Sequence, residues 1–548
     1  MKKKIVSGLL AMTIAASLIT GCGAAVDVAN DFHNTRPTQN IDTPVDVPAV
    51  VETESSQNKY SGTSDVCTEE ALYDNGGYYA IADCGPYVEP YYQGGESYAQ
   101  INENKFLSVK ENPLSTFSAD VDTASYSNVR RMILDGYEPE WIDKDAVRIE
   151  EMINYFSYDY KAPKANEPFS VNSSIAKCPW NNESYLMMVG LSTESIDFSE
   201  APASNLVFLI DVSGSMYDSN KLPLLQKSFT MLTDNLSEKD RVSIVTYAGD
   251  DRVVLRGARG DEKDTIKDAI NSLEAGGSTN GSAGIVTAYE LAERYFIEGG
   301  NNRVILATDG DLNVGITSNG GLEDLISSEK NSGVFLSVLG FGAGNIKDDK
   351  MELLADKGNG NYSYIDSVKE AKKVLVEEMG ATLVTVAKDV KFQLEFNSDV
   401  VAEYRQIGYE NRQMAAEDFD DDTKDAGEIG AGHSVTVLYE IKLAGSDAKA
   451  QKTQNWTTLH IRYKEPSEDV STELLYNIGS NEYSDELDRN MSFAAAVAEF
   501  GMILRDSEFK GNSTCDSVMK LVSNSGFRGD EYKEEFMEIV DIYAGMLH

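Results

Sequence analysis

Apolar runs and amphipathic segments alternate along the middle of the chain, between residues 204 and 380. An apolar run at 206–210 precedes leucines at helical spacing, and a second apolar run at 241–247 comes next. The pattern continues and predicts helices at 222–236, 262–273, 281–297, 322–331, 348–357 and 367–380, and further strands at 303–308, 334–340 and 361–365. Strands that alternate with helices form a parallel sheet covered on both faces. The pattern therefore predicts an α/β domain with a doubly wound, mostly parallel sheet.

Polar and apolar residues alternate with period two on both sides of this domain. The alternation occurs in four segments, 169–191, 390–396, 435–441 and 459–463. Period two is typical of strands that bury one face. We infer that the α/β domain is inserted in a β-sandwich-like domain, in which strands of 381–486 pair with strands of 168–192.

The two ends of the chain differ from its middle. Apolar stripes at helical spacing predict helices over 113–160 and in the C-terminal tail. Before them, a polar stretch without sustained periodicity is typical of a flexible chain. We therefore divide the chain into a signal peptide at 1–21, a flexible acidic tether at 22–111, an N-terminal region of helices followed by strands at 112–203, the α/β domain at 204–380, a β-rich region at 381–486 and a helical region at 487–548.

The first residues have the features of an export signal. Lys2, Lys3 and Lys4 precede a short apolar stretch, and Cys22 follows Thr-Gly. This arrangement resembles the bacterial lipobox, which implies cleavage before Cys22 and a lipid on its sulfur. The alternative is a plain secretory signal with an incidental cysteine. No later stretch reaches 18 apolar residues, so we expect a lipid-anchored protein of the bacterial cell membrane that faces outside the cytoplasm.

The charge balance excludes one class of partner. The chain has 48 basic and 90 acidic residues, and its formal net charge is −42. Nucleic acid would be repelled, because no basic stripe offers counterion release.

In an exported protein Cys67 and Cys84 are candidates for a disulfide, with free thiols as the alternative. The four histidines are scattered, which argues against a zinc site.

Five oxygen-bearing side chains occur where strands of the α/β domain end or helices begin. Asp211, Ser213 and Ser215 come at the end of its first apolar run. Thr279 stands in a glycine-containing loop just before a predicted helix, and Asp309 ends another apolar strand. Because ligand sites form at the carboxyl edge of such sheets, we expect the five side chains to gather there.

This set of oxygens suits a hard divalent cation. Mg²⁺ accepts a few protein oxygens and keeps water at its other positions, which leaves room for the carboxylate of a partner. The sequence therefore predicts a Mg²⁺ site, with Mn²⁺ or Ca²⁺ as alternatives. The other interpretation is that the five are turn and capping residues, since Asp, Ser and Thr favour such positions.

With these residues in this order, the α/β domain resembles the von Willebrand factor type A (VWA) family. The resemblance implies a metal-ion-dependent adhesion site. In that site Ser213, Ser215 and either Thr279 or Asp309 contact the ion directly, and Asp211 acts largely through water. The resemblance also suggests that ligand binding displaces the last helix of the domain.

The flanks narrow this resemblance to the YfbK-type bacterial lipoproteins. The matching segments are Asn112–Phe117, Asp120–Tyr126, Arg148–Phe156, Gly408–Arg412 and Asp425–His433. Together with the α/β domain, the resemblance covers about 112–548. It implies an architecture more than an activity.

Three functional hypotheses follow. The leading one is a cell-surface protein whose cation binds a carboxylate of a partner protein or matrix component, with no bond broken. An assembly or chaperone-like factor of the envelope is the second, and a metal-dependent hydrolase is the third. The sequence has no G-x-x-x-x-G-K-[ST] loop, no G-x-S-x-G elbow and no H-E-x-x-H motif, and no histidine lies near the site residues. We therefore expect no enzymatic activity.

Overall fold

The computed structural model describes residues 95–548, apart from 165–166, 197–200, 249, 278–281, 311–325, 327–331, 379, 381–382, 446–454 and 467. These residues belong to one compact unit of the chain, Val88–His548. The predicted signal peptide, Cys22, Cys67, Cys84 and Thr279 lie outside the described residues. Within the described part, no helix is long and apolar enough to cross a lipid bilayer.

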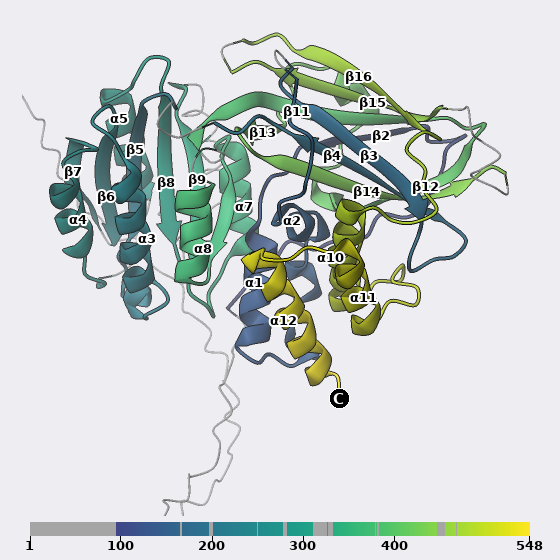
Figure 1. Cartoon of the computed structure of the whole chain (residues 1–548). Helices are drawn as coiled ribbons and strands as arrows, with labels where there is room; N and C mark the ends of the chain where they lie inside the picture. The colour runs from purple at the N-terminus through teal and green to yellow at the C-terminus, as the bar shows by residue number, and fades with distance from the viewer. Residues whose placement is uncertain are drawn as a thin grey trace, which may run out of the picture. The chain divides into compact units, whose positions relative to one another are not determined.

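The strands of the α/β domain form a six-stranded sheet in the order β10-β9-β8-β5-β6-β7 (Figure 1). Their bounds are β5 (Ser204–Asp211), β6 (Arg241–Ala248), β7 (Asp250–Arg259), β8 (Asn301–Thr308), β9 (Phe335–Phe341) and β10 (Tyr362–Ile365). All neighbours run parallel except β6 and β7. Every residue of β5 and β8 is buried, as expected at the centre of a covered sheet. The predicted fold class is confirmed.

Alternate residues of β5 face two separate cores. Leu206 and Phe208 pack with α3, α4 and α8 in one cluster, whereas Val207 and Leu209 pack with α5 and α7 in the other. Helices therefore cover both faces of the sheet, because side chains alternate along a strand. The helix bounds are α3 (Leu222–Asn235), α4 (Lys263–Asn271), α5 (Ser282–Arg294), α7 (Asp348–Lys357) and α8 (Val368–Lys372), which continues as a π-helical turn, Lys373–Glu377.

The edge strand β7 was not predicted from the sequence. It pairs antiparallel with β6, and the register shifts twice along the pair. Arg252, Arg256 and Arg259 of this strand are exposed. Charged residues on an edge strand discourage pairing with other chains, and they also obscure the period-two signal.

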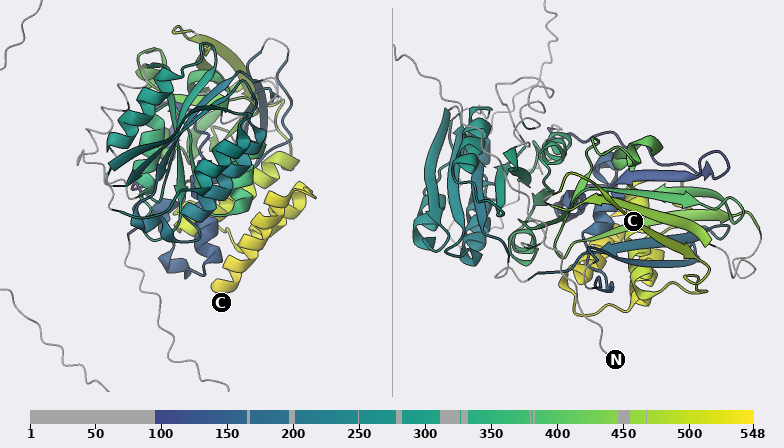
Figure 2. Two further views of the ribbon diagram at one scale, coloured as in Figure 1. Left: turned by 90° about the vertical axis from the view of Figure 1, so that its left-hand side faces the viewer. Right: turned by 90° about the horizontal axis from the view of Figure 1, so that it is seen from above.

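Strands from both sides of the α/β domain form two antiparallel sheets that share one core (Figure 2). The first has the order β1-β12-β14-β4-β3, and the second has the order β13-β11-β15-β16, with β2 also paired to β11. The bounds are β1 (Leu107–Ser108), β2 (Leu114–Ser118), β3 (Ser170–Lys177), β4 (Tyr185–Ser192), β11 (Thr385–Phe396), β12 (Val401–Ile407), β13 (Gly427–Gly430), β14 (Ser434–Leu443), β15 (Asn455–Lys464) and β16 (Thr472–Gly479). Because β4 pairs with β14 and β2 with β11, the α/β domain is inserted between strands of one sandwich.

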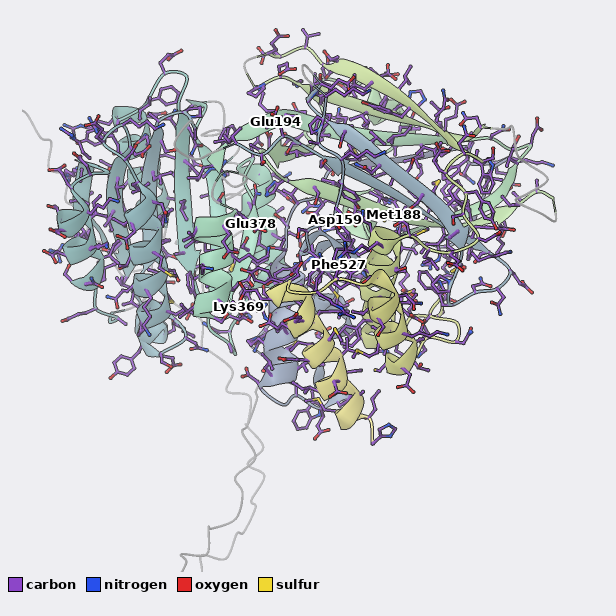
Figure 3. The ribbon with its side chains drawn as sticks, in the orientation of Figure 1. Asp159, Met188, Glu194, Lys369, Glu378 and Phe527 are labelled. Carbon is purple, nitrogen blue, oxygen red and sulfur yellow. The ribbon has the colours of Figure 1, made fainter. Side chains whose placement is uncertain are left out.

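A layer of helices covers the outer face of the first sheet. In β4, Met187 and Val189 face the sandwich core, whereas Leu186 and Met188 face the helices. Of these residues, Met188 is labelled in Figure 3. This strand is buried on both faces for that reason. The helices are α1 (Ala124–Leu134), α2 (Ile149–Asn154), α10 (Arg489–Arg505), α11 (Cys515–Ser525) and α12 (Glu531–Met546).

Two expectations for the N-terminal flank are wrong. Residues 113–160 are not all helical, because β2 is a strand in which Phe117 lies opposite Phe392 of β11. The tether predicted for 22–111 ends earlier than expected. Residues 95–111 are held by backbone contacts, since Ser97 donates to the carbonyl of Ile346 (2.8 Å) and β1 pairs with β12. Both errors involve pairing with distant segments, which local periodicity does not report.

Arg130 of α1 joins the helical layer to the last helix of the α/β domain. Its guanidinium lies 2.6 Å from Asp366, 2.7 Å from Glu370 of α8 and 2.8 Å from Glu535 of α12. Lys369 of α8, labelled in Figure 3, lies 3.2 Å from the same Glu535. The arginine is only 2% exposed. We call Arg130, Asp366, Glu370 and Glu535 the Arg130 cluster.

Replacing Arg130 with methionine should lower the free energy of unfolding by about 3–5 kcal/mol. The substitution removes the cation and leaves the buried carboxylates of Asp366 and Glu370 without it. Calorimetric melting at neutral pH measures the change. Lys144→Met is the control, because it removes only an exposed ion pair with Asp506 and should leave the melting temperature unchanged. Equal melting of Arg130→Met and wild type would contradict this assignment.

Glu150 of α2 is a buried carboxylate with an unpartnered oxygen. Its Oε2 has no hydrogen-bond partner, and the side chain is 1% exposed. Burial and the neighbouring charges of Glu410 and Asp120 raise its pKa to about 7, although the Arg505 guanidinium opposes the shift. The folded protein therefore holds this proton more tightly than the unfolded chain, whose carboxylate titrates near its ordinary value.

The stability should consequently fall as the pH rises from about 4.5 through about 7. A carboxyl whose pKa is raised on folding stabilises the fold while protonated, and this contribution is lost as the pH passes the folded pKa. Melting temperatures between about pH 5 and pH 8 test it. Glu150→Gln mimics the protonated form and should flatten the decline, whereas the exposed Glu111→Gln should not. An unchanged pH profile in Glu150→Gln would count against the assignment.

Candidate metal centre

The register of two parallel strands brings the first site residues together. Ile210 of β5 lies opposite Ala307 of β8, so Asp211 and Thr308 end the two strands side by side. The Thr308 hydroxyl donates a hydrogen bond to Asp211 Oδ2 (3.2 Å). Asp309, the next residue, is fully buried at the same carboxyl edge of the sheet.

The loop after β5 turns two serine hydroxyls toward one another. Asp211 Oδ1 accepts a hydrogen bond from the backbone N–H of Ser213 (2.9 Å), which shapes the start of the loop. The hydroxyls of Ser213 and Ser215 are 2.9 Å apart. Ser213 is buried and Ser215 is exposed, so the pair extends from the protein interior to the surface. Met216 is fully buried and anchors the far end of the loop.

The loop that carries Thr279 is attached to this serine loop. The Gly276 N–H donates to the Val212 carbonyl (2.8 Å), and the Gly214 N–H donates to the Gly277 carbonyl (3.2 Å). Gly277 has φ +90°, a conformation that favours glycine. Thr279 itself lies outside the described residues. The structure therefore brings four of the five predicted residues to one edge, and it anchors the fifth residue's loop two positions upstream.

Asp211 is a buried carboxylate among neutral partners. Burial raises its pKa to about 6, although the hydrogen bonds from Ser213 and Thr308 act in the opposite direction. The nearby charge of Asp309 contributes to the increase. A divalent cation at this edge would compensate the negative charge that these neutral donors leave in place.

Lys221 is a site residue that sequence reasoning missed. Its Nζ lies 2.9 Å from Asp309 Oδ2 and 3.0 Å from Asn345 Oδ1. Burial alone would raise the pKa of Asp309, but Asn345, Lys221 and Ser215 outweigh it and lower that pKa below its ordinary value. The lysine directly precedes α3, where a solvent-exposed side chain is the usual expectation, and no local pattern marks it.

The donor set fits a hard cation held mainly by hydroxyls. Among the described residues, no three His, Cys, Asp or Glu side chains gather in an arrangement that could hold a metal. The predicted centre needs no such group, because it relies on two serine hydroxyls, one threonine and two aspartates. Oxygen donors of this kind, with water at the other positions, match the coordination that Mg²⁺ prefers.

Comparisons with known proteins identify the family. A model of the von Willebrand factor type A domain matches residues 205–378, and a model described as "Uncharacterized protein YfbK, C-terminal" matches 381–546. A third, described as von Willebrand factor, matches 92–188. Uncharacterized protein YfbK of Escherichia coli (strain K12) is 43% identical over 477 residues, which cover 83% of this chain and 82% of that protein. The chain belongs to the YfbK family.

More distant similarities concern parts of the chain. Inter-alpha-trypsin inhibitor heavy chain H4 of Bos taurus is 27% identical over 146 residues, or 25% of this chain and 16% of that protein. A solved von Willebrand factor type A structure from Catenulispora acidiphila is 15% identical, covers 69% of this chain and 90% of its own, and has a TM-score of 0.42. The match of the family model to residues 205–378 shows that this YfbK-family chain contains a VWA domain, a type of domain that typically binds divalent cations.

Mg²⁺ should raise the melting temperature of the protein if the edge holds a cation. At ~100 times its Kd, a ligand of the folded state stabilises by about 2.7 kcal/mol. The double variant Ser213→Ala, Asp309→Ala should lose this shift, because it removes one hydroxyl and one carboxylate of the centre. Ser523→Ala, which removes an exposed helix hydroxyl, should keep it. Identical melting of the wild type in EDTA and in millimolar Mg²⁺ would argue against a metal centre.

Proposed function

We propose that this YfbK-family protein is a lipid-anchored envelope protein that binds an acidic partner protein or matrix component through a divalent cation in its VWA domain. The cation is Mg²⁺ in this proposal, with Mn²⁺ or Ca²⁺ as alternatives. Binding consists of ligand exchange at the metal, and no covalent bond is broken. The observation that supports the proposal best is the pair of serine hydroxyls 2.9 Å apart beside buried Asp211 and Asp309.

The exposure of the serine loop supports a role in binding. Gly214 and Ser215 are exposed, and the side chain of Tyr217 is 80% exposed. A large aromatic side chain that is exposed to solvent beside a polar site is a typical contact residue for a protein partner. The partner's carboxylate would complete the coordination of the cation while Tyr217 packs against the surrounding surface.

The N-terminal sequence supports the proposed location. Three lysines, a short apolar stretch and Cys22 form the pattern of an exported lipoprotein. A protein placed outside the cytoplasm has access to millimolar divalent cations and to other envelope proteins, which the proposed function requires. Metabolic labelling with a fatty-acid analogue, compared between wild type and Cys22→Ala, tests the anchor directly.

Capture of envelope proteins by the full-length protein tests the function itself. Wild type should retain partners in Mg²⁺ and release them in EDTA, and Asp211→Ala should retain none in either buffer. Tyr217→Ala should lose most of the capture while it keeps the Mg²⁺-induced rise in melting temperature, because Tyr217 touches the partner and not the ion. The same set of captured proteins in Mg²⁺ and EDTA would contradict the proposal.

A further inference from the structure

A buried ammonium group lies within the predicted metal centre. Lys221 is 5% exposed, and its partner Asp309 is fully buried. Its Nζ contacts Asp309 Oδ2 at 2.9 Å and Asn345 Oδ1 at 3.0 Å. An ion pair this deep requires a defined position for the lysine, because leaving either charge unpaired in the interior is costly.

The surrounding backbone fixes this position. Gly342, at φ +79°, lies so close to the lysine stem that an added Cβ would stand 2.3 Å from Lys221 Cε. The loop that contains Asn345 is held in turn by the segment at Gly95, whose added Cβ would meet the Gly344 carbonyl oxygen at 2.3 Å. The Gly344 N–H also donates to Glu96 (2.8 Å). The lysine stem is therefore closely packed against Gly342, in a loop that a segment far away in the sequence holds in place.

The lysine makes the net charge of the centre more positive by one, both without a bound cation and with one. The carboxylates of Asp211 and Asp309 together with Lys221 carry one net negative charge, and a bound divalent cation would turn this into one net positive charge. Without the lysine, the loaded centre would be neutral. A buried positive charge beside the cation repels it, and the same charge attracts an anion that completes its coordination.

We propose that Lys221 is a specificity-determining residue, which weakens the hold of the VWA domain on a lone divalent cation and favours a carboxylate as the added ligand. The inference rests on the proposed function and adds to it a reason for an acidic partner. Metal and carboxylate then bind cooperatively. The bound metal gives the centre a net positive charge, and the carboxylate of the partner neutralises this charge.

Removing the lysine charge does not remove the support of Asp309. The side chains of Asn345 and Ser215 also favour the charged form of this carboxylate and lower its pKa. Without metal, the neutral variant Lys221→Met buries Asp309 without its cation, whereas bound metal replaces the missing positive charge. The variant should therefore lose more stability in EDTA than in saturating Mn²⁺.

The test uses the full-length protein and measures free Mn²⁺ by electron paramagnetic resonance during a titration. Lys221→Met and the smaller Lys221→Gln should each bind Mn²⁺ ~10-fold more tightly than wild type, since the repulsion between the two cations is gone. Acetate, compared with chloride at equal ionic strength, should tighten Mn²⁺ binding to the wild type more than to either variant. Lys464→Met is the matched control, because Lys464 pairs with Asp389 (2.6 Å) in the sandwich, and this variant should leave Mn²⁺ affinity unchanged.

The outcomes separate the two proposals. Wild type that binds Mn²⁺ together with variants that bind it equally or more weakly would overturn the role of Lys221 and leave the proposed function standing. No Mn²⁺ binding by wild type or by either variant would overturn both. Tight binding by the variants alone would support the inference, because it would show that the lysine suppresses metal binding in the absence of a carboxylate.

Discussion

The parallel pairing of β5 and β8 determines where two buried carboxylates of the α/β domain lie. Their shared direction brings Asp211 and Asp309 to one edge of the sheet, and complete burial of both strands removes water from these carboxylates. Carboxylates without water need compensation from other groups. At this edge the compensating groups are a backbone N–H and a hydroxyl, which donate hydrogen bonds to Asp211, and the ammonium of Lys221, which contacts Asp309. The proposed metal centre would follow from this constraint, since a divalent cation compensates charge that the neutral donors cannot.

The same requirement recurs where the VWA domain meets the rest of the unit. Arg148 of the helical layer contacts Asp348 at the start of α7, and Arg412 lies 2.6 Å from Asp356 on the same helix. The Arg130 cluster links α1 with α8 and α12. Apolar packing is non-directional and can be satisfied by many pairs of surfaces. Each of these ion pairs, by contrast, requires two particular residues from distant segments. They therefore specify how the inserted domain is attached, even where their net contribution to stability is small.

The sequence predicted the elements whose signals are local and missed those that depend on distant partners. Strand β5 and helix α3 were predicted within a residue or two, because burial on both faces and a leucine stripe leave clear patterns. Four of the five centre residues meet as their strand ends require. Strand β7, by contrast, carries exposed arginines that hide its period, and residues 95–111 are held by backbone and side-chain contacts to segments distant in the sequence. Lys221 was missed for a related reason, since its burial depends on a glycine more than a hundred residues away.

The attachment of the last VWA helix constrains any signal that the domain transmits. The family resemblance suggests that ligand binding displaces this helix, yet Asp366 and Glu370 hold it to Arg130 through contacts of 2.6 and 2.7 Å. Breaking such a buried cluster costs on the order of 3–5 kcal/mol. A ligand shifts an equilibrium only by its difference in affinity for the two states, so displacement requires a preference on the order of 100-fold to several thousand-fold for the displaced form. Contacts of a partner with surfaces beyond the proposed metal edge would add to this preference, whereas binding without displacement would require only the cation, its anion and the exposed Tyr217.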